Sequence, residues 1–180
     1  MARVLVVYYS RTGTTKKVAL AIAQALSADL EQIADPMPRG GVLGWLKCGF
    51  DATFKRCTPI APPKLWPGIY DLVVIGSPTW NGSIASPVRT YLMRERLQLG
   101  AVAFFSTCGG RGADAVVAEM AEVSGHAPTA TLELKESEVL GGLLAEKVAP
   151  FVRAVTDAVE DIQRRNARPM SAVRVRHSAA

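Results

Sequence analysis

Three short loops carry most of the residues in this chain that are suited to bind a charged or planar molecule. The first spans residues 10–15 (SRTGTT) and holds four hydroxyl groups, one guanidinium group and one glycine. It follows the apolar run VLVVYY at residues 4–9 and precedes a helix predicted at residues 16–26. The free N–H groups and the positive dipole end of a helix start attract anions. This loop is therefore predicted to bind a phosphate group.

The same loop has a simpler interpretation. Thr14 or Thr15 could serve only to cap the helix, which is the commonest role of a hydroxyl residue at this place. The sequence also lacks both the GxxxxGK[ST] phosphate-binding motif and the GxGxxG dinucleotide-binding motif. Taken alone, the loop leaves both interpretations open.

Two further loops follow apolar runs that are typical of buried strands. Residues 70–77 (YDLVVIGS) lead into PTWNGS at residues 78–83, and residues 101–106 (AVAFFS) lead into TCGGRG at residues 107–112. In open α/β sheets, ligands bind beyond the carboxyl ends of the strands. All three loops would lie there, which favours a binding site over simple helix capping.

Strands and helices alternate along the chain, which predicts an α/β fold with a parallel sheet covered by helices on both faces. Weaker strands are expected at residues 30–34 and 129–134. Helices are predicted at residues 16–26, 42–56, 84–97, 113–123 and 140–164, with Pro150 as a kink or break in the last. The side chains expected to face the core are Val18, Ile22, Ala25 and Leu26 of the first helix and Val88, Tyr91 and Leu92 of the third.

Composition narrows the classes of protein to consider. With 180 residues, 49% hydrophobic and 21% charged, the chain is typical of one globular domain, and we expect it to be cytoplasmic. No apolar run approaches the length of a membrane span. Cys48, Cys57 and Cys108 form no CxxC pair, and the chain has two histidines. A disulfide framework, a metal site and triad chemistry are therefore not expected.

The net charge of +5 comes from the end of the chain. Residues 164–180 contain five arginines and no acidic residue, so the remaining 16 basic and 16 acidic residues balance. We assign residues 1–163 to a single domain and residues 164–180 to a basic tail. Such a tail could contact nucleic acid or anionic lipid, but a solvated chain end is the commoner outcome, and no specific nucleic-acid partner is expected.

Residues 35–68 form an insert with one predicted helix and a proline-rich loop. The helical spacing of Trp45, Phe50 and Phe54 predicts core contacts rather than cofactor contacts. Ile60, Leu65 and Trp66 are expected to pack the proline-rich loop against the domain.

Three segments together resemble the flavodoxin-like, FMN-binding proteins: YYSRTGTTKKVA, YDLVVIGSPTWNGSIASPVRTYL and FFSTCGGRGAD. Their order and spacing match over residues 3 to about 125. The resemblance implies a three-layer, doubly wound, five-stranded parallel sheet with the strand order 2-1-3-4-5.

The resemblance also implies a set of FMN-binding residues. Those that would surround the phosphate, with no metal, are Ser10, Arg11, Thr12, Gly13, Thr14 and Thr15. Those that would border the isoalloxazine ring, with Trp80 against it, are Pro78, Thr79, Trp80, Asn81 and Gly82. Those that would reach its pyrimidine edge are Thr107, Cys108, Gly109, Gly110 and Gly112.

One departure from the short electron-carrying flavodoxins bears on function. Those proteins usually place a second aromatic residue in the third loop and are strongly acidic, whereas this chain has Cys108-Gly109-Gly110 and a neutral domain. An open ring face favours an FMN-dependent oxidoreductase that passes electrons from NAD(P)H to a quinone or similar acceptor through flavin N5. The flavin would carry the chemistry, and no residue is assigned as catalytic.

Two alternatives remain from the sequence. One is a non-catalytic electron-transfer flavodoxin that serves a redox partner protein. The other is a flavodoxin-like module that has lost its flavin, but the intact SRTGTT loop argues against it. Related reductases often pair near the third loop and its helix, so the resemblance also suggests a homodimer.

Overall fold

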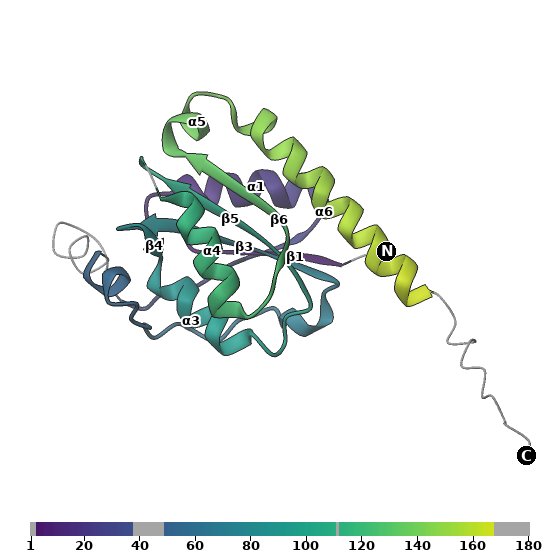
Figure 1. Ribbon diagram of the computed structural model, residues 1–180, viewed down its shortest axis with the longest axis horizontal. Helices are drawn as coiled ribbons and strands as arrows, with labels where there is room; N and C mark the ends of the chain where they lie inside the picture. Colours follow the sequence, from purple (N-terminus) through teal and green to yellow (C-terminus); the bar gives the residue numbers. More distant parts are fainter. Residues whose placement is uncertain (1–2, 38–48, 111, 168–180) are drawn as a thin grey trace, which may run out of the picture.

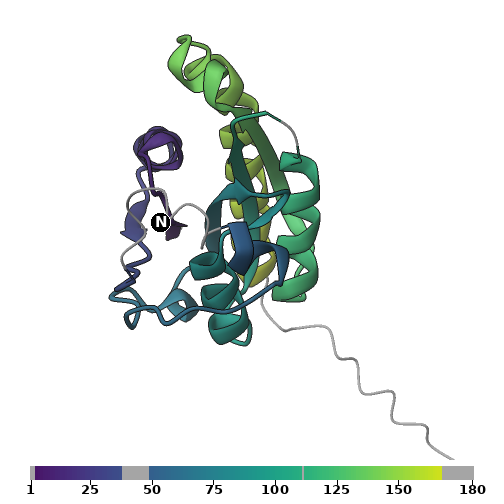
Figure 2. The same ribbon diagram turned by 90° about the vertical axis from the view of Figure 1, so that its left-hand side faces the viewer.

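Five parallel strands form the centre of the fold, with helices on both sides (Figures 1 and 2). The computed structural model describes residues 3–37, 49–110 and 112–167. The strands are β1 (Val4–Tyr8), β2 (Asp29–Gln32), β3 (Leu72–Trp80), β5 (Ala101–Cys108) and β6 (Pro128–Lys135). Their order is β2-β1-β3-β5-β6, and each neighbouring pair is parallel. β4 (Ser83–Ile84) is a short antiparallel addition that pairs with β3 and lies off this path. Without β4, the order of the five parallel strands is 2-1-3-4-5, which confirms the predicted doubly wound sheet.

The two faces of the sheet bury separate hydrophobic clusters, since successive side chains of a strand point to opposite faces. Val6 and Phe105 belong to the cluster under α1 (Thr14–Leu26) and α6 (Leu144–Ala167). The opposite cluster contains Leu5 and Phe104. It lies under α3 (Ser86–Glu95) and α4 (Ala113–Ser124), which confirms Val88, Tyr91 and Leu92 as inward-facing residues.

The buried face of α1 differs slightly from the prediction. Val18 and Ile22 are buried and Leu26 is half-buried, but Ala25 is exposed. Ala19 and Ala23 are buried instead. They follow Val18 and Ile22 directly in sequence, so the apolar stripe is rotated toward them by one residue.

The loop expected at residues 78–83 is a β-hairpin. β3 continues to Trp80, and the register pairs Thr79 with Ile84 and Trp80 with Ser83. Asn81 and Gly82 form the two-residue turn, with φ angles of 49° and 75°. Asn-Gly is the sequence that this type of turn favours, because both positions need a positive φ.

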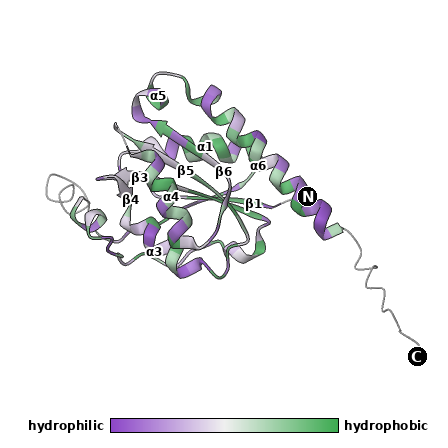
Figure 3. Cartoon of the chain, in the orientation of Figure 1, coloured by the Kyte–Doolittle hydropathy of each residue, from purple (hydrophilic) through white to green (hydrophobic). Residues whose placement is uncertain are grey.

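The C-terminal part of the fold contains two helices rather than the single predicted helix at 140–164. α5 (Glu136–Leu140) and α6 are separated at Gly142, which has a φ of 86°. Pro150 lies within α6 and does not end it. The last turns of α6 are hydrophilic (Figure 3). They extend into the segment assigned to the basic tail, and residues 168–180 lie outside the described residues.

The insert packs differently from the expectation. Its predicted helix at 42–56 is described only from residue 49, with helical residues at 49–53; Trp45 and Cys48 lie outside the described residues. Phe50 and Phe54 are 49% and 61% exposed, so their prediction as core residues is wrong. Trp66 is also exposed, whereas Ile60 and Leu65 pack against the core as expected.

Among the described helices, none is long and apolar enough to cross a membrane. Within the same residues, no cluster of histidine, cysteine or acidic side chains is arranged to hold a metal ion.

Candidate functional site

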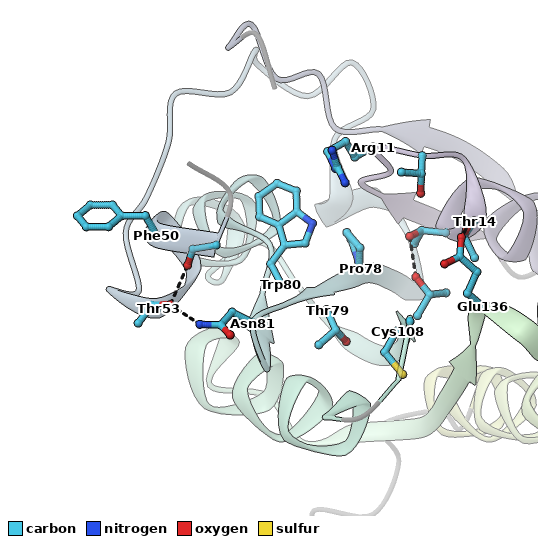
Figure 4. Close-up of a pocket in the computed structure, with 15 residues that line it drawn as sticks. Arg11, Thr14, Phe50, Thr53, Pro78, Thr79, Trp80, Asn81, Cys108 and Glu136 are labelled. Carbon is cyan, nitrogen blue, oxygen red and sulfur yellow. Dashed lines mark hydrogen bonds between the residues drawn. The ribbon is translucent and has the colours of Figure 1, made fainter. Parts of the chain in front are cut away.

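A cavity of about 720 Å³ lies where β1, β3 and β5 end (Figure 4). It brings the three loops together. The predicted site residues that line it are Arg11, Thr12, Thr14, Thr15, Pro78, Thr79, Trp80, Asn81, Thr107, Cys108 and Gly109. The predicted residues outside the lining are Ser10, Gly13, Gly82, Gly110 and Gly112.

The start of α1 forms one end of the cavity. Gly13 takes the N-cap position with a φ of 99°, and no side chain of the described residues caps this helix. The Gly13 amide donates a hydrogen bond of 3.1 Å to Ser10 Oγ, which folds the loop back on itself. The amide groups of the first helical turn are thus left for a guest at the positive end of the helix dipole.

Thr14 and Thr15 are not caps, so the capping interpretation is wrong. Both residues lie within the helix, and their hydroxyls are directed to other elements. Thr14 Oγ1 donates to Glu136 Oε1 at 2.8 Å, and Thr15 Oγ1 shares a buried hydrogen bond of 2.8 Å with Thr107 Oγ1. The second bond ties the first loop to the third. Sequence reasoning could not detect either contact, because the partners are 122 and 92 residues apart.

The β3–β4 hairpin forms the opposite wall. Trp80 meets Tyr9 edge to face, with ring centroids 5.5 Å apart. Thr79 Oγ1 is buried and has no hydrogen-bond partner among the described residues. Figure 4 shows Trp80 and Pro78 between the Thr14–Glu136 end and the Phe50–Thr53 end of the cavity. A buried hydroxyl without a partner is costly.

The third loop lies beside the hairpin and leaves open space. Cβ atoms built at Gly109 and Gly110 would meet no described atom within 4 Å. At Gly112, which begins α4 with a φ of 91°, a Cβ would lie 3.3 Å from Gly82 Cα. Gly112 therefore supports the site by letting the third loop approach the hairpin turn closely, although neither Gly112 nor Gly82 lines the cavity.

The comparisons with known proteins bear on the class of this site. The family described as flavodoxin matches residues 3–155. The chain belongs to the flavodoxin family.

Solved structures agree with this flavodoxin fold. A Lactobacillus acidophilus flavoprotein in complex with FMN is 24% identical, covering 79% of this chain and 98% of its own, with a TM-score of 0.65. Oxidised flavodoxin 2 from Bacillus cereus is 17% identical over 87% of this chain and 99% of its own, with a TM-score of 0.58. A WrbA-like flavodoxin from Agrobacterium tumefaciens is 16% identical over 89% and 99%, with a TM-score of 0.56. A search of the curated proteins found no match.

Four residues that line the cavity of this flavodoxin were missed by sequence reasoning: Gly49, Phe50, Thr53 and Glu136. The first three belong to the insert, which contacts the hairpin through a 2.6 Å hydrogen bond from Asn81 Nδ2 to Thr53 Oγ1 (Figure 4). The Arg56 guanidinium lies 5.0 Å from the centre of the Phe50 ring. Residues 49–53 of the insert thus form part of the cavity wall, which only the tertiary structure reveals.

Proposed function

We propose that this flavodoxin family member binds FMN in the cavity and uses it to pass electrons from NAD(P)H to a quinone or similar planar acceptor. In this arrangement the phosphate lies at the start of α1, and the isoalloxazine ring lies between the hairpin and the third loop. The family match and the FMN complex of the L. acidophilus flavoprotein support the cofactor assignment. A cavity of about 720 Å³ is within the range of cofactor pockets.

The phosphate end fits a dianion through three kinds of group. The first turn of the 13-residue α1 supplies backbone amides, Thr12 and Thr14 supply hydroxyls, and Gly13 keeps the helix start clear of a Cβ atom. Glu136 opposes this fit, because its carboxylate is already hydrogen-bonded to Thr14. We therefore expect Glu136 to release Thr14 when the phosphate enters.

The ring end fits a flat aromatic guest with polar edges. Trp80 offers an aromatic surface, and stacking on such a surface contributes about 0.5–1.5 kcal/mol beyond burial. Thr79 also lines this wall, and its buried hydroxyl has no hydrogen-bond partner among the described residues. Asn81 and the rest of the hairpin turn complete this wall.

The open space over Gly109 and Gly110 is the observation that favours a reductase. No described residue of the loop between β5 and α4 carries an aromatic side chain, and Cβ atoms at both glycines would meet no described atom within 4 Å. A second planar molecule therefore has room beside the ring. When bound, FMN would accept a hydride from NAD(P)H and pass two electrons to the quinone, which gains two protons, one supplied by solvent. The chain would orient both partners and exclude water from their contact.

Anaerobic mixing of the FMN-loaded protein with NADH or NADPH tests this proposal. We expect the visible flavin absorbance to bleach faster than that of free FMN with the same nicotinamide, and to return when a soluble benzoquinone is added. A bound flavin that stays oxidised with both nicotinamides, yet is reduced by dithionite, would contradict the reductase and support the electron-transfer flavodoxin.

A further inference from the structure

The β3–β4 hairpin is too small to hold its own shape. Its second strand has two residues, Ser83 and Ile84, and lies off the main sheet. Isolated two-stranded hairpins are marginally stable at best in water. The wall that carries Thr79, Trp80 and Asn81 therefore needs support from another element.

Glu119 of α4 provides that support. Its side chain is 10% exposed, and Oε2 accepts hydrogen bonds from Ser83 Oγ at 2.6 Å and from the Ile84 amide at 2.9 Å. One carboxylate oxygen therefore holds a side chain and the backbone of β4 at once. Neither Glu119 nor these contacts belong to the cavity lining.

The other carboxylate oxygen of Glu119 faces positive charge. Oε1 accepts a hydrogen bond from the buried Arg89 guanidinium of α3, and Lys55 Nζ lies 3.6 Å away. Arg89 also donates to Ser83 Oγ at 3.1 Å. Ser83, Arg89 and Glu119 thus form a closed, buried triangle, whereas Lys55 is 64% exposed and contributes little.

The charge state of Glu119 agrees with this geometry. Burial acts to raise the pKa of its carboxyl group, but hydrogen bonds from Ser83, Arg89 and the Ile84 amide, together with the Arg89 charge, hold the pKa below its ordinary value. The group is therefore ionised at neutral pH. A buried carboxylate that is both ionised and fully hydrogen-bonded has a fixed orientation.

We infer that Glu119 is the positioning residue of the β3–β4 hairpin and, through it, sets how tightly the cavity holds oxidised and reduced flavin. The flavin part rests on the proposed function, whereas the hairpin part stands on the contacts of Glu119 alone. Asn81 and Thr53 extend the same support to the insert, because their side chains are hydrogen-bonded across the cavity edge.

Amide hydrogen exchange of the full-length chain without flavin tests the hairpin part. In Glu119→Gln, peptides that cover residues 79–85 should exchange at least tenfold faster than in the wild type, while peptides from α6 should be unchanged. Ser83→Ala keeps every charge and removes two of the contacts, so it should give a smaller increase in the same peptides. Glu122→Gln, an exposed site on the same helix, is the matched control. It should change the exchange rate neither in residues 79–85 nor in α6.

Flavin titration and potentiometry of the same variants test the second part. Ser83→Ala and Glu119→Gln should weaken FMN binding and change the ratio of oxidised to reduced flavin affinity by about fivefold, which is about 20 mV for a two-electron couple. Unchanged exchange in residues 79–85, or an equal increase in all peptides, would overturn the positioning role. If the wild type binds no flavin, the proposed function fails, while the exchange result still decides the role of Glu119.

Discussion

The two ends of the cavity are built in different ways. The phosphate end comes from six consecutive residues, 10–15, whose backbone is shaped by one helix start and one glycine with positive φ. The ring end comes from a two-residue turn that is held by side chains of α3, α4 and the insert. A local backbone motif would thus bind the phosphate, and a tertiary network shapes the surface against which the ring would lie.

A carboxylate next to each end shows the difference most clearly. Glu119 faces Arg89 and is neutralised by it, so it stabilises the hairpin. Glu136 accepts a hydrogen bond from Thr14 at the proposed phosphate site, where it competes with the guest. The same chemical group therefore supports the hairpin at the ring end and would oppose binding at the proposed phosphate end.

Removal of Arg89 should have the largest effect on stability. Arg89→Ala would leave the buried Glu119 carboxylate without its main positive partner, and such changes cost about 3–5 kcal/mol in the free energy of unfolding. Urea denaturation monitored by circular dichroism measures it. Arg164→Ala removes an arginine whose side chain is 69% exposed and should cost less than about 1 kcal/mol. Similar losses of unfolding free energy in the two variants would show that the buried Ser83, Arg89 and Glu119 triangle stabilises the fold no more than a surface ion pair does.

Loss of the Thr12 and Thr14 hydroxyls should weaken the binding of a flavin that carries a phosphate but not of one that lacks it. Thr12→Ala with Thr14→Ala should weaken FMN binding by about a hundredfold or more, because two hydrogen bonds to a charged group contribute about 1.5–3 kcal/mol each. Riboflavin, which has no phosphate, should bind as it does to the wild type. Thr156→Ala on α6 is the control. Equal loss for both flavins would contradict the assignment of this end to the phosphate.

The pH dependence of stability should reveal the ionised form of Glu119. Since the folded-state pKa lies below the ordinary value of 4.5, Glu119 stabilises the fold above that pH, and this contribution is lost as the pH falls through the folded pKa. The difference in unfolding free energy between the wild type and Glu119→Gln should therefore be largest near neutral pH and shrink below about 4.5. A difference that stays constant with pH would mean that ionisation is not involved.

The smallest effect is expected at Glu136 and has the opposite sign. Glu136→Gln removes a negative charge beside the phosphate site while keeping a side chain that can accept from Thr14. FMN affinity should rise several-fold, consistent with a surface charge interaction of about 1 kcal/mol. Fluorescence titration at low and high salt measures it, and the gain should shrink at high salt. Weaker FMN binding would show that Glu136 assists the phosphate.

The sequence predicts the phosphate end better than the ring end for a physical reason. Gly13 and the Ser10 hydroxyl act locally, so their positions in the chain already specify the loop and the helix start. The three apolar runs likewise predict the buried central strands, whereas the strand order was implied by the resemblance to flavodoxin-like proteins. The Asn81-Gly82 hairpin is also locally encoded, since that dipeptide favours such a turn, but residues 78–83 were predicted as a turn without the second strand.

The remaining features depend on contacts between distant residues. Glu119 lies on a helix whose sequence shows no motif, and its role appears only when α4 packs beside the hairpin. Phe50 has the spacing of a core residue, yet the helical turn at 49–53 lies over the cavity rather than over the sheet. Glu136 reaches Thr14 only because β6 ends next to the start of α1.

The most direct test of the account is a parallel titration of the flavin-free protein with FMN and with riboflavin, followed by flavin fluorescence. We predict that one FMN binds per chain, and that riboflavin binds at least tenfold more weakly because it lacks the phosphate that the start of α1 would hold. No binding of FMN, or equal affinity for the two flavins, would contradict the central claim that this cavity is an FMN site anchored at the helix start.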